Sequence, residues 1–288
     1  MPGMEEALTF TDQHGHRVAA ILATPEAPTD RAVLLCHGFL SGKNSTTNKT
    51  LTRSLTEQDI ATFRFDFFGQ GESEGPFENL TITIALGQAL AALDQLFARG
   101  YRRIGLVGSS FGGLIAILTA ARWSHPPTPG VVTPTHPAPA GTGASPHGRA
   151  SSRGPELACL GLKCPVVDFA EVLRLEFGEA GMAHWKTHHE IPDVTGGPKP
   201  VRLRYALYEN CLEYDGHKAA AMIKMPTLIV QGEKDDLVPL HQSRRLMEVL
   251  QGKRQLEILP GADHAFSKGE DFKKLTTLLA DWMVKHLN

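Results

Sequence analysis

The sequence predicts an α/β protein with a mostly parallel central sheet, an N-terminal antiparallel hairpin and helices on both faces. Short apolar runs alternate along the chain with longer segments of helical periodicity, a pattern typical of βαβ units. One apolar run ends in a glycine-flanked serine and continues directly into an apolar helix. Two later runs end in loops that carry aspartates and a histidine, at the edge where parallel sheets gather their sites.

The first half of the chain begins with two alternating segments, Ala7 to Thr24, which predict a hairpin that turns at residues 12–15. Ala32 to Cys36 is continuously apolar, as expected of a strand buried on both faces. The remaining elements follow from apolar residues at strand or helix spacing. They are a helix from Asn48 to Gln58, a strand from Ala61 to Asp66, a helix from Leu80 to Arg99 and a strand from Arg103 to Gly108.

The second half continues the alternation of strands and helices, and no internal repeat is visible. Its last helix follows the final strand and is expected to cover the sheet. The expected elements are helices at Gly112–Trp123, Leu240–Leu250 and Phe272–His286, and strands at Leu160–Val167, Pro226–Gly232 and Gln255–Leu259.

Length and composition predict one domain over residues 1–288, because 42% hydrophobic content supplies a sizeable core. Residues 124–155 interrupt it with eight prolines and five glycines, and we interpret them as a low-complexity insertion. The helix before this insertion runs away from the expected site, so the insertion is a poor candidate for a lid. Its three histidines lack the short ligand spacing of zinc sites and do not predict a metal site: His125, His136 and His147.

A second interruption, residues 168–223, follows a strand and therefore starts on the expected site side of the sheet, so we predict a lid or cap there. Its aromatic side chains either line a pocket or bury the underside of the lid; they are Phe177, Trp185, Tyr205, Tyr208 and Tyr214. We select Trp185, Tyr205 and Tyr208 as the candidate substrate-binding residues. The nearby histidines lack the two-histidine pattern around a glutamate that zinc peptidases use, so no metal is predicted: His184, His188 and His189, followed by Glu190.

Charge and cysteine content limit the class of partner. The formal net charge is −2 and no long basic run occurs, so we expect neither nucleic acid nor a membrane as a partner. The N-terminus lacks a signal-peptide pattern and no run of 18 apolar residues occurs, which predicts a cytoplasmic protein. Four cysteines are too few for a disulfide framework. We expect a near-neutral small-molecule substrate, and a homodimer is compatible with these features.

Ser110 is the candidate nucleophile, because it lies between a strand and a helix with Gly108 and Gly112 two residues away on either side. A sharp, strained turn needs small residues at those positions, and the start of the helix suits a developing oxyanion. A glycine-rich helix start can also serve close packing or phosphate binding alone. Ser73 has the same glycine spacing but lies in a polar run without a following apolar helix, so we interpret it as a loop serine.

An acid and a histidine follow the serine in the chain order that this arrangement requires. Asp235 and Asp236 both follow a strand that ends in Gly232, and His264 follows the next strand. From the residues alone, either aspartate could orient the histidine.

The chain resembles the α/β-hydrolase superfamily along nearly its whole length, and is most similar to small bacterial carboxylesterases of the cinnamoyl and feruloyl esterase type. The motifs are Cys36-His37-Gly38-Phe39, Phe65 to Ser73, Gly108-Ser109-Ser110-Phe111-Gly112, Gly232-Glu233-Lys234-Asp235 and Asp263-His264. The resemblance implies Ser110 as nucleophile, His264 as general base, Asp235 as the orienting acid, and the backbone amides of Phe39 and Phe111 as the oxyanion hole. It would leave Asp236 to cap the following helix.

The expected activity is therefore hydrolysis of small acyl or aryl esters through an acyl-enzyme, without a cofactor. A serine aminopeptidase or a thioesterase on the same fold remains an alternative, because fold and triad do not fix the leaving group. An aminopeptidase would need an acidic group for the substrate amine, and Glu171, Glu176 and Glu179 are available. A non-catalytic, ligand-binding member of the fold is the alternative from a different class.

Overall fold

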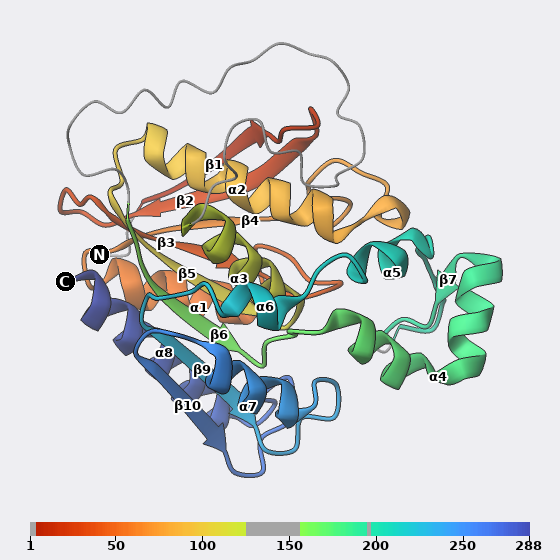
Figure 1. Ribbon diagram of the computed structural model, residues 1–288. Coiled ribbons are helices and arrows are strands. Elements are labelled where there is room, and N and C mark those ends of the chain that lie inside the picture. The colour runs from red at the N-terminus through yellow and green to blue at the C-terminus, as the bar shows by residue number, and fades with distance from the viewer. Residues whose placement is uncertain (1–3, 125–155, 195–196) are drawn as a thin grey trace.

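The computed structural model describes residues 4–124, 156–194 and 197–288 (Figure 1). Its centre is an eight-stranded sheet with the order β1-β2-β4-β3-β5-β6-β9-β10. β1 and β2 form an antiparallel hairpin, β2 pairs antiparallel with β4, and all other neighbours are parallel. The predicted α/β fold, with its N-terminal hairpin, is confirmed. The strands are β1 (Met4–Thr11), β2 (Arg17–Thr24), β3 (Arg31–Cys36), β4 (Ala61–Phe65), β5 (Arg103–Ser109), β6 (Glu156–Lys163), β9 (Thr227–Gly232) and β10 (Arg254–Leu259).

Helices cover both faces of this sheet (Figure 1). They bury two separate apolar clusters. One cluster packs α2 (Ile82–Ala98), α3 (Phe111–Ser124), α6 (Gly216–Ala220) and α7 (Leu240–Val249) against the sheet. The other packs α1 (Thr46–Thr56) and α8 (Gly269–Leu287) against the opposite face. Apolar β-strands with both faces covered are what a parallel sheet requires. Within the described ranges, no helix combines the length and apolar character needed to cross a membrane.

The predicted strand at Leu160–Val167 is wrong in its bounds, because β6 ends at Lys163. Cys164 has a φ of 41° and Pro165 follows it. A left-handed backbone and a residue without an N–H cannot continue a central strand. The apolar residues beyond β6 therefore form part of the loop that leads to α4.

The predicted helix cap at Asp236 is also wrong. α7 begins at Leu240 with Pro239 at the cap position, and no described side chain hydrogen-bonds to its first turn there. Asp236 is exposed in the preceding loop. Pro239 supplies the helical φ at this end, so the helix starts without a side-chain cap.

The low-complexity insertion predicted at residues 124–155 starts at Ser124, the last residue of α3, and stops before β6 begins at Glu156. Its remaining residues, with His125, His136 and His147, lie outside the described residues.

The segment predicted as a lid projects from the end of the sheet (Figure 1). It contains α4 (Phe169–His188), with non-helical backbone at Gly178, followed by the short pair β7 (Glu190–Ile191) and β8 (Val201–Arg202), and then α5 (Ala206–Cys211). Gln242 of α7 anchors its start. The buried Gln242 amide accepts hydrogen bonds from the N–H groups of Val167 (2.8 Å) and Asp168 (3.1 Å) and donates to Glu171 (2.7 Å).

Candidate active site

Ser110 lies at the turn between the last residue of β5 and the first residue of α3. Its φ is 51°, a conformation that costs a non-glycine residue energy and is characteristic of functional turns. Three backbone hydrogen bonds hold it: the Ser110 N–H donates to the Lys163 carbonyl (2.9 Å), and the Ser110 carbonyl accepts from Gly113 (2.8 Å) and Val166 (3.1 Å). The serine is thereby fixed between β6 and α3.

The glycines on either side of Ser110 are required by close backbone contacts. A Cβ on Gly108 would lie 2.3 Å from the Gly112 carbonyl oxygen, and one on Gly112 would lie 2.3 Å from the carbonyl oxygen of Cys36. Both distances are far below van der Waals contact. The Gly-x-Ser-x-Gly spacing therefore has a steric cause here, as the sequence predicted.

Asp235 lies directly beside His264. The His264 Nδ1 is 3.0 and 2.9 Å from the two carboxylate oxygens, and the Asp235 side chain is only 1% exposed. The N–H groups of Leu237 and Val238 also donate to Asp235. Burial alone would raise the pKa of Asp235, but the hydrogen bond and charge of His264 outweigh it and hold the pKa below its usual value. The structure thus brings Asp235, and not the exposed Asp236, to the histidine.

Two buried polar side chains that were not predicted as site residues hold Asp235 in place. The Gln231 Nε2 donates to the Asp235 carboxylate at 2.6 Å, and the Ser243 hydroxyl donates to the Gln231 Oε1 at 2.8 Å. Both Gln231 and Ser243 are fully buried. A glutamine inside the apolar run Thr227–Gly232 was the available signal, since a buried amide needs partners.

The two segments that carry the predicted oxyanion amides, those of Phe39 and Phe111, lie next to Ser110. Phe111 is the first residue of α3, where an N–H has no partner within the helix. The loop that carries Phe39 passes close by, since a Cβ on Gly38 would lie 3.6 Å from the Ser110 Cβ. Buried His37 fixes this loop. Its Nε2 accepts from the Phe67 N–H (3.0 Å), so its Nδ1 donates to the Gly38 carbonyl (2.7 Å), and burial lowers the pKa of His37 to about 4.

Ser110, Phe39 and His264 line one cavity of about 260 Å³. Its apolar wall comes from α4, the loop before α4 and the loop before α7: Val166, Phe169, Val172, Leu173, Phe177, Leu237 and Val238. Glu176 also lines the cavity, whereas Glu171 pairs with His241 (3.0 Å) and Gln242. The arrangement therefore offers an apolar surface for one part of a small substrate beside the serine.

The three aromatic residues predicted to bind substrate lie elsewhere. Among the described residues that line the cavity, Trp185, Tyr205 and Tyr208 do not occur. Trp185 is fully buried, donates from Nε1 to the Leu203 carbonyl (2.7 Å) and packs edge-on against Phe177 and both tyrosines. These rings form the small core of the projecting segment. Only Phe177, of the rings in this contact, reaches the cavity.

We therefore expect Trp185→Ala to act on stability. Removal of a fully buried indole leaves a cavity that costs about 3–5 kcal/mol in the free energy of unfolding, which urea denaturation measures. Leu175→Ala, on the same helix but 61% exposed, is the control and should change it by about 0.5 kcal/mol or less. A loss below about 1 kcal/mol with an altered ester preference would restore the substrate-contact interpretation.

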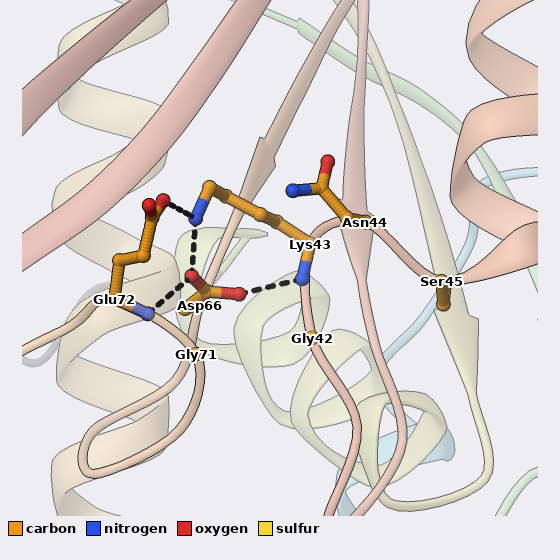
Figure 2. Close-up of a pocket in the computed structure, with 7 residues that line it drawn as sticks. All are labelled: Gly42, Lys43, Asn44, Ser45, Asp66, Gly71 and Glu72. Atoms are coloured by element: carbon orange, nitrogen blue, oxygen red, sulfur yellow. Dashed lines mark hydrogen bonds and ion pairs between the residues drawn. The ribbon is translucent and has the colours of Figure 1, made fainter.

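A second, wider hollow of about 530 Å³ lies beside Asp66 (Figure 2). The Lys43 ammonium contacts both the Asp66 and the Glu72 carboxylates. The Asp66 carboxylate also accepts hydrogen bonds from the N–H groups of Lys43 (2.6 Å) and Glu72 (2.9 Å). A Cβ on Gly71 would strike the Asp66 carboxylate at 2.3 Å. These contacts tie the loop after β4 to the loop that carries Phe39. The charged groups in this hollow are already paired with one another. We therefore take the cavity at Ser110 as the candidate site.

Ser73 belongs to the same loop and has a structural place. Its hydroxyl accepts from the Ala19 N–H (2.9 Å) and donates to the Asp66 carbonyl (2.6 Å). It does not line the cavity among the described residues, which agrees with its interpretation as a loop serine.

We expect Lys43→Met to destabilise the protein by about 3–5 kcal/mol, because it leaves the buried Asp66 carboxylate without its countercharge. Burial alone would lower the pKa of Lys43, but the two carboxylates raise it above its usual value. Lys49→Met removes an exposed charge from α1 and should change the free energy of unfolding by about 0.5 kcal/mol or less. Equal stability of the two variants in urea denaturation would contradict a structural role for the ion pairs.

One group of described residues brings three metal-ligating atoms within 4.8 Å of one another: Cys164, Asp235 and His264. Asp235 and His264 are already bonded to each other, and burial raises the pKa of the Cys164 thiol well above its usual value, which disfavours the thiolate that metals bind. The three residues are therefore better explained by the Asp235–His264 hydrogen bond than by a metal site.

Comparisons with known proteins agree with the fold. A 31.7 kDa Escherichia coli protein from the traX-finO intergenic region, described as uncharacterized, is 24% identical over 267 residues, which cover 88% of this chain and 91% of that protein. A hydrolase structure from Agrobacterium vitis, described as putative, has 22% identity and a TM-score of 0.75, and covers 99% of this chain and 100% of its own. Est1E from Butyrivibrio proteoclasticus, solved with bound ferulic acid, has 20% identity and a TM-score of 0.76, with 97% and 99% coverage.

A family model for hydrolases, described as serine aminopeptidase S33, matches residues 27–271. This range contains Ser110, Asp235 and His264 together with the loops that hold them. The chain therefore belongs to this family of the α/β-hydrolase superfamily.

Proposed function

We propose that the protein is a serine carboxylesterase that cleaves small acyl or aryl esters through an acyl-enzyme. The observation that carries the proposal is that strained Ser110, His264 and Phe39 line one cavity, with Asp235 hydrogen-bonded to the histidine. Nucleophile, base and orienting acid in this relation define a hydrolytic triad by geometry and role.

In the proposed mechanism, Asp235 holds His264 through Nδ1, which leaves Nε2 to accept the proton of Ser110. The Ser110 oxygen attacks the ester carbonyl, and the N–H groups of Phe39 and Phe111 donate to the oxyanion. His264 then protonates the leaving alcohol. A water molecule, deprotonated by the same histidine, releases the acid from the serine.

An apolar or aryl part of the ester is assigned to the apolar wall of the cavity. Phe169 and Phe177 of α4, with Leu173 between them, offer flat and branched surface beside Ser110. Est1E with bound ferulic acid supports aryl esters as substrates to test.

Aminopeptidase activity is the second candidate, because Glu176 lines the cavity and could receive a substrate amine. A panel of 4-nitrophenyl esters beside aminoacyl 4-nitroanilides separates the two activities. We expect turnover of the esters and little release of nitroaniline. Turnover of the anilides with no cleavage of esters would replace the carboxylesterase assignment with an aminopeptidase.

A further inference from the structure

One wall of the cavity carries a charge that ester hydrolysis does not use. Lys163, the last residue of β6, lines the cavity together with Ser109, Ser110 and His264. Lys163 and Ser109 are register partners on neighbouring parallel strands, so their side chains leave the same face of the sheet. A cationic side chain therefore lies at the strand ends that hold the proposed nucleophile, Ser110.

The Lys163 ammonium has no carboxylate partner among the described residues. It lies 5.5 Å from the centre of the Phe266 ring, and no carboxylate of the described chain lies within ion-pair distance. Asp235 and Asp263 act on it only from farther away, and they are bonded to His264 and Ser267. Burial lowers the pKa of Lys163, which the nearby thiol and carboxylates oppose in part. An ammonium with three donors is stabilised when an anion reaches it.

Ser109 adds an unused hydroxyl to the same wall. Its side-chain oxygen is buried and has no hydrogen-bond partner among the residues that the structure describes, which is costly unless a ligand or water supplies one. Ser45 and Thr47, at the start of α1, also line the cavity. α1 has no acidic residue in its first turn, so its positive end is not offset there. This part of the lining therefore favours negative charge, in contrast to the apolar residues from α4.

We propose that Lys163 and Ser109 form a subsite for a carboxylate or similar oxyanion of the substrate, and that the preferred esters carry such a group on their acyl part. The inference rests on the proposed esterase function. Lys163 acts here as a specificity-determining residue. Glu176 is the acidic residue among the described residues that line the cavity, and it is exposed on α4. It therefore does not neutralise the positive charge of Lys163.

Matched ester pairs test the subsite. The 4-nitrophenyl monoesters of adipic and suberic acid are compared with 4-nitrophenyl hexanoate and octanoate, which have the same acyl lengths without the terminal carboxylate. The readout is the ratio of kcat/KM for the anionic ester to kcat/KM for its neutral match. Lys163→Met should lower the larger of the two ratios about tenfold or more, as expected for loss of a charge-assisted hydrogen bond. Lys163→Arg should retain most of the ratio, and Ser109→Ala should lower it several-fold.

Lys234→Met is the matched control, because Lys234 is exposed near Asp235 and is not among the described lining residues. It should leave the ratios unchanged. If Lys163→Met also leaves both ratios unchanged while the wild-type protein cleaves the neutral esters, the subsite is refuted and the esterase function stands. If the wild-type protein cleaves none of the esters, the proposed function fails and the subsite fails with it.

Discussion

Ser110→Ala should reduce kcat/KM for a 4-nitrophenyl ester by about 10⁴-fold or more. The substitution removes the atom that forms the acyl-enzyme, and the loss of a triad nucleophile has effects of this size. The backbone of the turn should persist, because its hydrogen bonds to Lys163, Gly113 and Val166 use main-chain atoms. Steady-state rates with the chromogenic ester, together with a circular dichroism spectrum, check the result.

Ser73→Ala is the matched control, since both serines have the same glycine spacing. It removes hydrogen bonds to Ala19 and Asp66, so some stability is lost while most of the esterase activity at 25 °C should remain. Retention of activity in Ser110→Ala together with its loss in Ser73→Ala would show that the nucleophile has been assigned to the wrong serine.

Asp235→Asn should lower kcat by about 10⁴-fold, the effect expected when the acid of a triad is replaced by its amide. An amide cannot stabilise the imidazolium of His264 and favours the wrong tautomer. Its NH₂ group would also face either the Gln231 amide donor or the N–H donors of Leu237 and Val238, so hydrogen bonds on that side are lost. Initial rates at saturating ester measure the effect.

Asp236→Asn provides the comparison at the neighbouring position. Asp236 is exposed and His264 is bonded to Asp235, so this variant should keep kcat within a few-fold of the wild-type value. A greater loss in Asp236→Asn than in Asp235→Asn would require a rearrangement of the loop and would overturn the choice of acid.

Local sequence patterns were sufficient to predict most strands of the sheet and the turn around Ser110. Apolar runs located the strands, and the glycines at 108 and 112 correspond to contacts that leave no room for a side chain. The end of β6 was misplaced because Cys164, Val166 and Val167 continue the apolar pattern of the strand. Hydrophobic periodicity does not register the positive φ of Cys164 that ends it.

The pocket depended on tertiary contacts that a linear pattern does not contain. Trp185 and Phe177 are both aromatic and lie in the same segment, yet Phe177 reaches the cavity and Trp185 fills the core of the segment. Which ring faces the serine follows from the break in α4 at Gly178 and from the packing of α5 on α4. Lys163 and Ser109 become neighbours only through the pairing of β5 with β6.

Labelling with a fluorophosphonate, followed by mass spectrometry of the labelled peptide, tests most directly the claim that Ser110 is an activated nucleophile. The probe reacts with a serine only where a base and an oxyanion hole activate it. We expect one stoichiometric label on Ser110, lost in Ser110→Ala and strongly slowed in Asp235→Asn. An unlabelled wild-type protein would indicate a non-catalytic member of the fold, and a label on another serine would contradict the proposed site.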